Sequence, residues 1–427
     1  MTATDTHRAI DAVWRIESAR LIASLARMVR DVGRAEDLAH DALVAALERW
    51  PETGVPDKPG AWLMATAKRR AIDLLRRDSL LERKHAELGR EVDARREDEI
   101  DELEAAIDDD IGDDLLRLIF TSCHPVLSKE ARVALTLRLM GGLTTDEIAR
   151  AFLVSEPTIA QRIVRAKRAL SEAQVPFEVP REEERTVRLA SVLEVIYLIF
   201  NEGYSATAGD DWMRPELCDD ALRLGRILAE LVPGEAEVHG LVALMEIQGS
   251  RSRARVGPAG EPILLLEQDR SRWDHVLIRR GLAALERAAR LGGDRGSYVL
   301  QAEIAACHAR ARTPGETDWA RMAALYEELA RLAPSPVVEL NRAVAVGFAS
   351  GPAAGLALVD RLTSEPALRD YHLLPGVRGD LLARLGRFEE ARAELERAAS
   401  LTRNEAERRL LLERAAGLAR KEEGGRG

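Results

Sequence analysis

A run of Thr, Gln and Arg side chains between residues 158 and 168 has the spacing and chemistry of a base-reading surface. At about 100° per residue, one face of a helix here would carry Thr158, Gln161, Arg162, Arg165 and Arg168. The opposite face would carry Ile159, Ile163, Ala166 and Leu170. Arg and Gln donate hydrogen bonds to base edges in the major groove, and the flanking Lys167 could contact a phosphate. The alternative is an ordinary amphipathic helix with a solvated basic face.

A second basic surface is expected on the helix that follows Pro59-Gly60. Its apolar face would carry Leu63, Ala67, Ala71 and Leu74. Its other face would carry Trp62, Thr66, Arg69, Arg70, Asp73, Arg76 and Arg77. An aromatic ring at the head of an Arg-rich face suits single-stranded DNA, because bases stack on rings while phosphates contact cations. The alternative for Trp62 is a core position beneath an exposed basic face.

The elements that must position the first surface form a helix-turn-helix pattern. Thr144, with Glu147 three residues later, is a capping box that begins a helix just after a Gly-Gly pair. After a short turn, Ser155 can cap the next helix, and Pro157 is tolerated in the first turn of that helix. In such motifs the second helix enters the major groove, so this pattern favours DNA binding.

The sequence offers no candidate for catalysis. It contains no GxxxxGK[ST] loop, no GxSxG, no HExxH and no GxGxxG after an expected strand. Cys123-His124 and Cys307-His308 are adjacent pairs without companion ligands, so we interpret both as buried structural residues. We therefore predict that the protein is not an enzyme and has no catalytic residue, no metal and no cofactor.

Charge is distributed unevenly along the chain. The net charge is -10, but residues 1–96 carry a net of +2 and residues 115–175 a net of +4. Between these blocks, residues 97–114 carry eleven acids and no base. Such a segment is typical of a solvated linker, and a second interpretation is that it mimics nucleic acid and screens the basic blocks.

Targeting signals are not apparent. The start of the chain has no apolar signal region, and the most apolar window, 189–200, is short and contains Glu194. The three cysteines lie far apart, which argues against a disulfide framework. We expect a soluble, cytoplasmic protein with no membrane contact.

The C-terminal region reads as a series of helices of ten to eighteen residues separated by Pro and Gly. Residues 381–401 space Gly386, Phe388, Ala391, Leu395 and Ala398 as tetratricopeptide repeats do. Segments 325–334 and 221–233 resemble the ends of further copies, which predicts three or four repeats. Such repeats form concave surfaces for a peptide or protein ligand, and simple helical packing without a ligand is the alternative.

Several segments, taken in order, resemble a known family. RAEDLAHDAL, PGAWLMATAKRRAIDLLRR, the acidic spacer and LTTDEIARAFLVSEPTIAQRIVRAKRAL resemble a bacterial RNA polymerase sigma factor of the extracytoplasmic-function (ECF) group of the sigma-70 family, over about residues 8–175. VIYLIFNEGY, LLLEQDRSRWD and SPVVELNRAVAV resemble the subgroup with a fused C-terminal tetratricopeptide-like domain.

The resemblance implies an all-α protein of four parts. These are a sigma region 2 domain (8–78), an acidic flexible linker (79–111), a region 4 helix-turn-helix domain (112–175) and a C-terminal tetratricopeptide-like regulatory domain (181–420). Region 2 would dock on core polymerase and melt the minus-ten element. Region 4 would recognise the minus-thirty-five element.

The same resemblance assigns roles to individual residues. Docking on the coiled coil of the polymerase β′ clamp falls to Asp37, Leu38, Asp41 and Val44. The 50–58 loop would capture a flipped minus-ten base, and minus-ten contact and melting fall to Trp62, Lys68, Arg69, Arg70, Arg76 and Arg77. Minus-thirty-five recognition falls to Thr158, Gln161, Arg162, Arg165, Lys167 and Arg168.

The implied partners are core RNA polymerase, through its β′ clamp coiled coil and β flap, and promoter DNA. The chain would be a monomer when free, and its C-terminal domain would regulate activity in cis. Two alternatives remain open at this point. One is a helix-turn-helix transcriptional activator with a tetratricopeptide-type sensing domain, and the other is a repeat scaffold in which the basic blocks are incidental.

Overall fold

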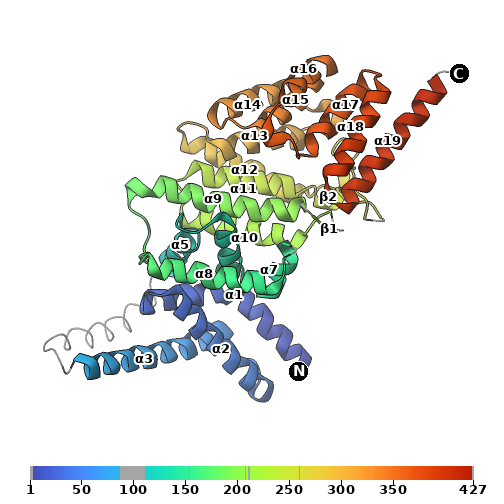
Figure 1. Ribbon diagram of the computed structural model, residues 1–427. Coiled ribbons are helices and arrows are strands. Elements are labelled where there is room, and N and C mark those ends of the chain that lie inside the picture. Colours follow the sequence, from blue (N-terminus) through green and yellow to red (C-terminus); the bar gives the residue numbers. More distant parts are fainter. Residues whose placement is uncertain are drawn as a thin grey trace. The chain divides into compact units, whose positions relative to one another are not determined.

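The computed structural model describes residues 3–86, 111–152, 154–206, 208–209, 212–258 and 260–425. These residues are mostly helical, as Figure 1 shows, so the predicted all-α fold is confirmed. The chain divides into two compact units, Met1–Ile196 and Tyr197–Gly427. The boundary falls inside one continuous helix, α9 (Glu182–Tyr204).

Unit 1 contains two sets of helices in addition to the first part of α9. The first set is α1 (Ala3–Val29), α2 (Val32–Thr53) and α3 (Pro59–Ala86). The second set is α5 (Ile111–Ser122), α6 (Lys129–Thr136), the π-helical turn η1 (Leu137–Gly141), α7 (Thr145–Phe152) and α8 (Glu156–Glu172).

Helix α1 is the centre of unit 1 and packs against α2, α3, α5 and η1. Small side chains on α1, such as Ser18, Ala19 and Ala23, are buried and let neighbouring backbones approach closely. One such approach is at Gly142, which adopts φ +71 at the end of η1. A Cβ atom at Gly142 would lie 2.9 Å from the Ser18 hydroxyl, so glycine suits both the backbone conformation and the close contact.

Two predicted boundaries differ from the structure. Helix α2 continues to Thr53 through Pro51, so the predicted 50–58 loop is confined to 54–58. Helix α3 continues to Ala86, so the first part of the predicted 79–111 linker is helical. Most of the acidic segment lies at 87–110, outside the described residues.

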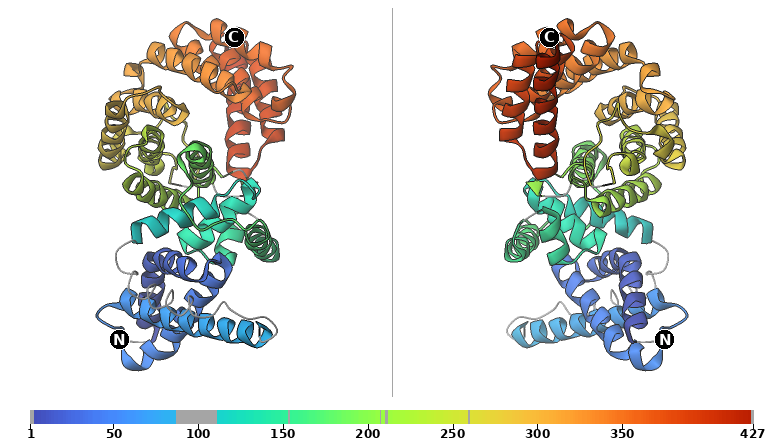
Figure 2. Two further views of the ribbon diagram at one scale, coloured as in Figure 1. Left: turned by 90° about the vertical axis from the view of Figure 1, so that its left-hand side faces the viewer. Right: turned by 90° about the vertical axis from the view of Figure 1, so that its right-hand side faces the viewer.

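Unit 2 is a series of helices, each packed on its neighbours in sequence along a curved path (Figure 2). Its α-helices after α9 are α10 (Pro215–Leu231), α11 (Ala236–Gly249), α12 (His275–Leu291), α13 (Ser297–Arg310), α14 (Trp319–Leu332), α15 (Pro336–Ala349), α16 (Pro352–Leu362), α17 (Leu373–Arg384), α18 (Phe388–Leu401) and α19 (Glu405–Gly425). Short 3-10 turns are η2 (Ser252–Ala254), η3 (Arg270–Arg272), η4 (Pro314–Glu316) and η5 (Pro366–Leu368).

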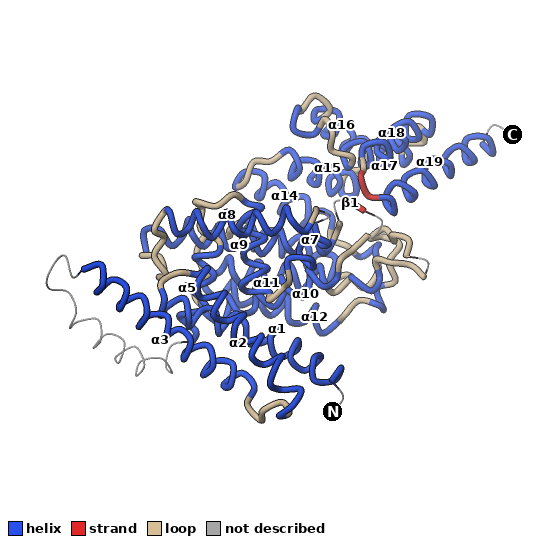
Figure 3. The backbone as a smooth tube through the Cα atoms, turned by 60° about the horizontal axis from the view of Figure 1, so that its bottom comes forward, coloured by secondary structure: helices blue, strands red, loops and turns tan. Residues whose placement is uncertain are grey.

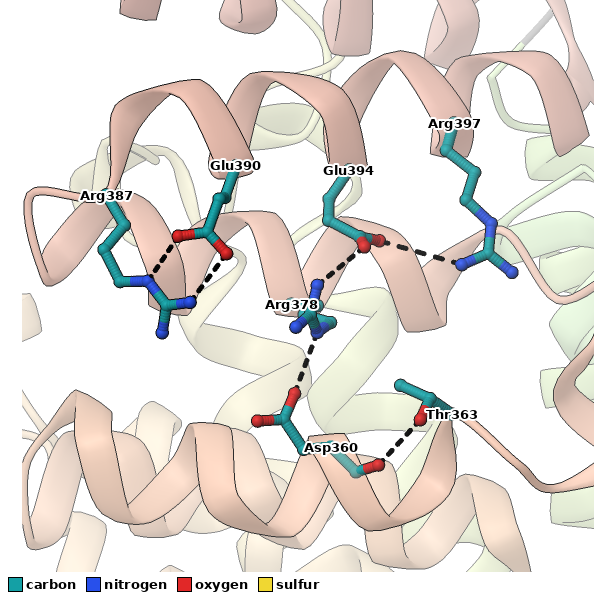
Figure 4. Close-up of polar contacts among 7 residues, drawn as sticks. All are labelled: Asp360, Thr363, Arg378, Arg387, Glu390, Glu394 and Arg397. Carbon is teal, nitrogen blue, oxygen red and sulfur yellow. Dashed lines mark hydrogen bonds and ion pairs between the residues drawn. The ribbon is translucent and has the colours of Figure 1, made fainter.

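Ion pairs join three successive helices of this series, as Figure 4 shows. Arg378 on α17 donates to Asp360 on α16 at 2.9 Å and to Glu394 on α18 at 2.7 Å. Arg387 pairs with Glu390 at 2.6 Å within the beginning of α18. These contacts lie beside an apolar core and fix the order of the stacked helices more than they add stability, because partly exposed pairs contribute little.

The two ends of unit 2 meet in a short parallel strand pair, drawn in red in Figure 3. Strand β1 (Ala208–Gly209) follows α9, and β2 (Arg403–Asn404) precedes α19. The buried Asn404 side chain also donates to the Ala206 carbonyl at 3.2 Å. The curved series of helices is therefore tied end to end.

The described residues hold neither a membrane-spanning helix nor a cluster of metal-ligating side chains. Among those residues, no helix is both long and apolar enough to cross a membrane. Within the same ranges, no three His, Cys, Asp or Glu side chains are grouped so that they could hold a metal ion.

Candidate nucleic-acid interface

Helix α8 presents the predicted reading face outward. Ile159, Ile163, Ala166 and Leu170 are buried against α6 and α7, as the helical spacing predicts. Thr158, Gln161, Arg165 and Arg168 are exposed, and Arg162 is half-buried. Arg168 pairs with Glu172 one turn later at 2.6 Å, so it is the member of this face that already has a carboxylate partner on α8.

The turn before α8 is built by local capping, with one difference from the prediction. Ser155 occupies the N-cap position, but its side chain makes no hydrogen bond to the backbone of α8. Its hydroxyl instead lies 2.7 Å from that of Thr158. Pro157 lies in the first turn, as predicted.

The predicted capping box of α7 is confirmed. The Thr144 amide donates to the Glu147 carboxylate at 2.8 Å, and the Glu147 amide donates to the Thr144 hydroxyl at 3.1 Å. Arg15 on α1 also pairs with Glu147 at 2.8 Å. Burial alone would raise the pKa of Glu147, but the Thr144 hydrogen bonds and the Arg15 charge outweigh burial and lower it. Glu147 therefore caps the N-terminus of α7 and also joins α7 to α1.

A hollow of about 460 Å³ lies beside the reading face. Gln161, Arg162 and Arg165 line one side, and the 126–131 segment lines the other. Glu130 in that segment has a pKa held below its usual value by hydrogen bonds from its own amide and from Ser128, and by the nearby Arg162 charge. A carboxylate therefore lies near Arg162 at the border of the reading face.

The Lys167 side chain does not point outward with the reading face of α8. Its Nζ atom lies 2.5 Å from Oε2 of Glu36 on α2, and the Lys167 side chain is largely buried. Glu36 is only 3% exposed and also accepts from Nε of Arg138 on η1 at 2.6 Å. We call Glu36, His40, Arg138 and Lys167 the Glu36 cluster. The sequence predicts a phosphate contact for Lys167, and no pattern in the sequence predicts its ion pair with Glu36.

The Glu36 cluster has a defined protonation pattern. His40 Nδ1 lies 2.9 Å from the Glu36 carbonyl and Nε2 lies 2.9 Å from Arg138 Nη2. Because Arg can only donate, Nε2 accepts and the proton is on Nδ1. Burial, followed by the Arg138 charge, lowers the pKa of His40. Burial would raise the pKa of Glu36, but the Lys167 and Arg138 charges lower it, so the carboxylate is ionised.

The predicted melting face lies on α3. Leu63, Ala67 and Ala71 are buried, Arg69, Arg76 and Arg77 are exposed, and Lys68 and Arg70 are half-buried. Arg70 pairs with Asp41 on α2 at 3.3 Å. The half-buried Trp62 contacts the buried Trp50 edge to face, with ring centroids 5.4 Å apart. Trp62 is therefore packed on one side while part of its ring remains accessible.

The predicted docking residues do not all share one surface of α2. Asp37, Asp41 and Val44 are exposed, and the Val44 side chain is an apolar patch at 50% exposure. Leu38 is 7% exposed and belongs to the core of unit 1. Asp37, Asp41 and Val44 are spaced by four and three residues and so line one exposed stripe, while Leu38 points inward.

The first part of α9 packs on α5, α6 and the turn between them. Ser191 donates to the Cys123 carbonyl at 2.7 Å and accepts from Arg132 on α6. Arg188 donates to the Phe120 carbonyl at 3.0 Å. Glu194 pairs with Lys129 at 2.5 Å. The predicted domain bounds, 112–175 and 181–420, assign α9 to the C-terminal domain and give no indication of this attachment.

Comparisons with family models match three parts of the chain. Residues 16–80 match sigma-70 region 2, and residues 117–170 match sigma-70, region 4. Residues 188–289 match DUF6596, a family of unknown function. The matched region 2 contains α2 and the melting face of α3, and the matched region 4 contains the helix-turn-helix. The tetratricopeptide-like subgroup stays a prediction.

Two relatives show how far the similarity extends. An uncharacterized protein of Rhizobium meliloti (strain 1021) is 44% identical over 388 residues, which cover 90% of each chain. The probable ECF RNA polymerase sigma factor SigI of Mycobacterium tuberculosis is 27% identical over 186 residues, or 44% of this chain and 62% of that one. No solved structure is significantly similar. The chain therefore belongs to the same family as the Rhizobium meliloti protein. In this chain, the segments that match sigma-70 region 2 and region 4 precede the segment that matches DUF6596.

Proposed function

We propose that this protein is an ECF-type sigma factor that binds core RNA polymerase, directs it to specific promoters and helps to open them. The observation that carries the proposal is the placement of two outward-facing basic surfaces, one on the matched region 2 and one on the matched region 4. A protein that reads duplex DNA alone needs the second of these surfaces but has no use for an aromatic, Arg-rich melting face.

Each surface has a proposed role. On α8, Thr158, Gln161, Arg162 and Arg165 would read the minus-thirty-five element. On α3, the accessible part of Trp62 would stack on an unpaired minus-ten base, and the exposed arginines would contact phosphates. On α2, the stripe of Asp37, Asp41 and Val44 would dock on the β′ clamp coiled coil. Region 4 would contact the β flap.

The C-terminal region would act on these domains in cis. Support for this comes from α9, because its first part packs on region 4 while the same helix continues into unit 2. A peptide or protein ligand of the curved helical series would then be sensed through a helix shared with the DNA-reading domain. The ligand would be recognised by the concave side of the series, as in other helical repeat arrays.

Co-elution of the full chain with core RNA polymerase tests the proposal. Stoichiometric binding is expected, and it should be lost in an Asp37→Arg, Asp41→Arg variant, which reverses charge on the exposed stripe of α2. Asp11→Arg, on the exposed side of α1, is the matched control and should still co-elute. If none of the three proteins binds polymerase while duplex DNA is still bound, the chain is instead an activator of the helix-turn-helix type.

A further inference from the structure

An apolar hollow of about 550 Å³ lies within unit 2, among α14, α15, the last three helices and the turn before η3. The turn contributes three consecutive leucines, 264–266, of which Leu266 is exposed. The hollow is also lined by the buried side chains of Leu381 on α17, Leu395 on α18 and Leu418 on α19. Small-molecule sites are typically hollows of about 300–1,000 Å³ with apolar walls and a few polar groups. The hollow therefore has the size and lining of such a site.

Three planar groups form another part of the lining. Trp319 at the start of α14 and Phe348 on α15 are stacked, with ring centroids 4.2 Å apart. The guanidinium carbon of Arg384 on α17 lies 4.1 Å from the centroid of the Phe348 ring. Nη2 of Arg384 also donates to the Gly347 carbonyl at 3.0 Å. The ring and the carbonyl therefore hold the Arg384 guanidinium in place before any ligand arrives.

Four charged side chains line the hollow, and their pairing leaves one oriented cation. Arg414 on α19 pairs with Asp380 on α17. Within the described part of the chain, Arg384 is in no ion pair with a carboxylate. Glu267 is exposed on the turn, where its carboxylate can stay hydrated. Because the guanidinium fork of arginine matches the geometry of a carboxylate, the polar part of the hollow suits a carboxylate ligand.

A glycine of α19 leaves space in the hollow. Gly417 lies in the interior of that helix, where glycine is less favourable than alanine. A Cβ atom at Gly417 would meet no atom within 4 Å, and the residue does not adopt a positive φ. Neither a close contact nor the backbone conformation therefore requires glycine there. Since Gly417 lines the hollow, a larger side chain at this position would take up space in it.

We propose that this hollow binds a small apolar molecule that carries one carboxylate. The apolar body lies among the leucines, and the carboxylate accepts hydrogen bonds from Arg384. The inference rests on the proposed function for its regulatory meaning, because it names a small molecule as the ligand that the C-terminal region senses here. A ligand in the hollow contacts the 264–267 turn together with α17, α18 and α19, so its binding stabilises unit 2 by mass action.

Isothermal titration calorimetry of the full chain with sodium decanoate tests the ligand class. Saturable binding is expected, and decylamine, which has the same chain length and the opposite charge, should bind about ten-fold more weakly or less. Arg384→Met should remove this preference, whereas Arg361→Met, at an exposed position of α16, should keep it. Absence of decanoate binding would overturn the proposal, as would equal binding of the two compounds. Binding of a tripeptide that ends in leucine, without binding of decanoate, would replace it with a peptide site.

Filling the hollow tests the location of the site. Gly417→Phe should abolish decanoate binding, and Ala416→Phe, which adds the same ring at the next, exposed position of α19, should bind as wild type does. Decanoate binding by Gly417→Phe at the wild-type affinity would overturn the site. If circular dichroism shows that Gly417→Phe is unfolded, Leu266→Asp decides, because it places a negative charge in the exposed part of the lining.

The titrations need neither polymerase nor promoter DNA. A chain that binds decanoate but does not co-elute with core polymerase would contradict the proposed function and leave the site in place. A chain that co-elutes but does not bind decanoate would overturn the site alone.

Discussion

The hydroxyl of Ser191 donates a hydrogen bond to the carbonyl oxygen of Cys123 at 2.7 Å. Ser191 belongs to the segment that matches DUF6596, and Cys123 belongs to the segment that matches sigma-70 region 4. The same hydroxyl accepts from Arg132, and all three side chains are buried. The first helix of the DUF6596 region is thus also a structural part of the helix-turn-helix domain.

Replacing Ser191 should loosen that domain. In Ser191→Ala, the buried Cys123 carbonyl and Arg132 each lose a partner, which costs about 1–3 kcal/mol. Hydrogen exchange of the α5 and α6 amides should accelerate roughly five- to hundred-fold. Ser171→Ala, at an exposed position on α8, is the control and should exchange at the wild-type rate. Equal exchange in both variants would mean that α9 does not support region 4.

The reading face should separate promoter recognition from polymerase binding. Arg162→Ala with Arg165→Ala should reduce transcription from a minus-thirty-five-dependent promoter by at least ten-fold, since each base contact is worth about 1–3 kcal/mol. Co-elution with core polymerase should be unchanged. The promoter can be selected by in vitro transcription of genomic fragments. Arg181→Ala, an exposed arginine beyond α8, is the control, and parallel loss of both activities would contradict the assigned face.

Stability of unit 2 should depend on the titration of His308. Burial, followed by the charges of Arg251 and Arg270, lowers the pKa of His308 from 6.5 to about 3. At pH values between about 3 and 6.5, the unfolded chain therefore binds a proton at His308 more tightly than the folded chain does. The contribution of His308 to the free energy of unfolding is complete above pH 6.5. It falls as the pH drops towards 3, by up to about 1.4 kcal/mol per pH unit.

Urea denaturation of unit 2 between pH 7 and pH 5 measures this effect. His308→Gln should flatten the fall of the midpoint with decreasing pH, because the titrating group is gone. His275→Gln replaces an exposed histidine and should keep the wild-type slope. A slope in His308→Gln as steep as in wild type would show that other groups control the acid response.

Short-range patterns in the sequence were sufficient to predict much of the helix-turn-helix formed by α7 and α8. The Thr144 and Glu147 capping box depends on residues three positions apart, and the buried stripe of α8 follows from a 3.6-residue period. Both are confirmed. Ser155 shows the limit even here, because its hydroxyl bonds to the Thr158 side chain rather than to the backbone of α8.

Long-range contacts could not be predicted in the same way. Glu36 and Lys167 are far apart in sequence, and each has the polarity of a surface residue. Only the fold shows that they pair in a buried site. A weak signal was present, since Ala35 and Ala39 flank Glu36 and small side chains often mark close helix packing. Likewise, the Pro-rich stretch at 176–180 suggested a domain boundary, whereas the packing of region 4 continues through Ser191 and Glu194.

The pairing of β1 with β2 changes how unit 2 should come apart. An open helical array loses its terminal repeats first, because an end repeat has a neighbour on one side only. Here the segment before α19 is hydrogen-bonded to the segment after α9, so each end supplies the missing neighbour of the other. Unit 2 should therefore open in a single cooperative step instead of fraying from its ends. A structural change at its last helix, α19, should then also affect its first, α9.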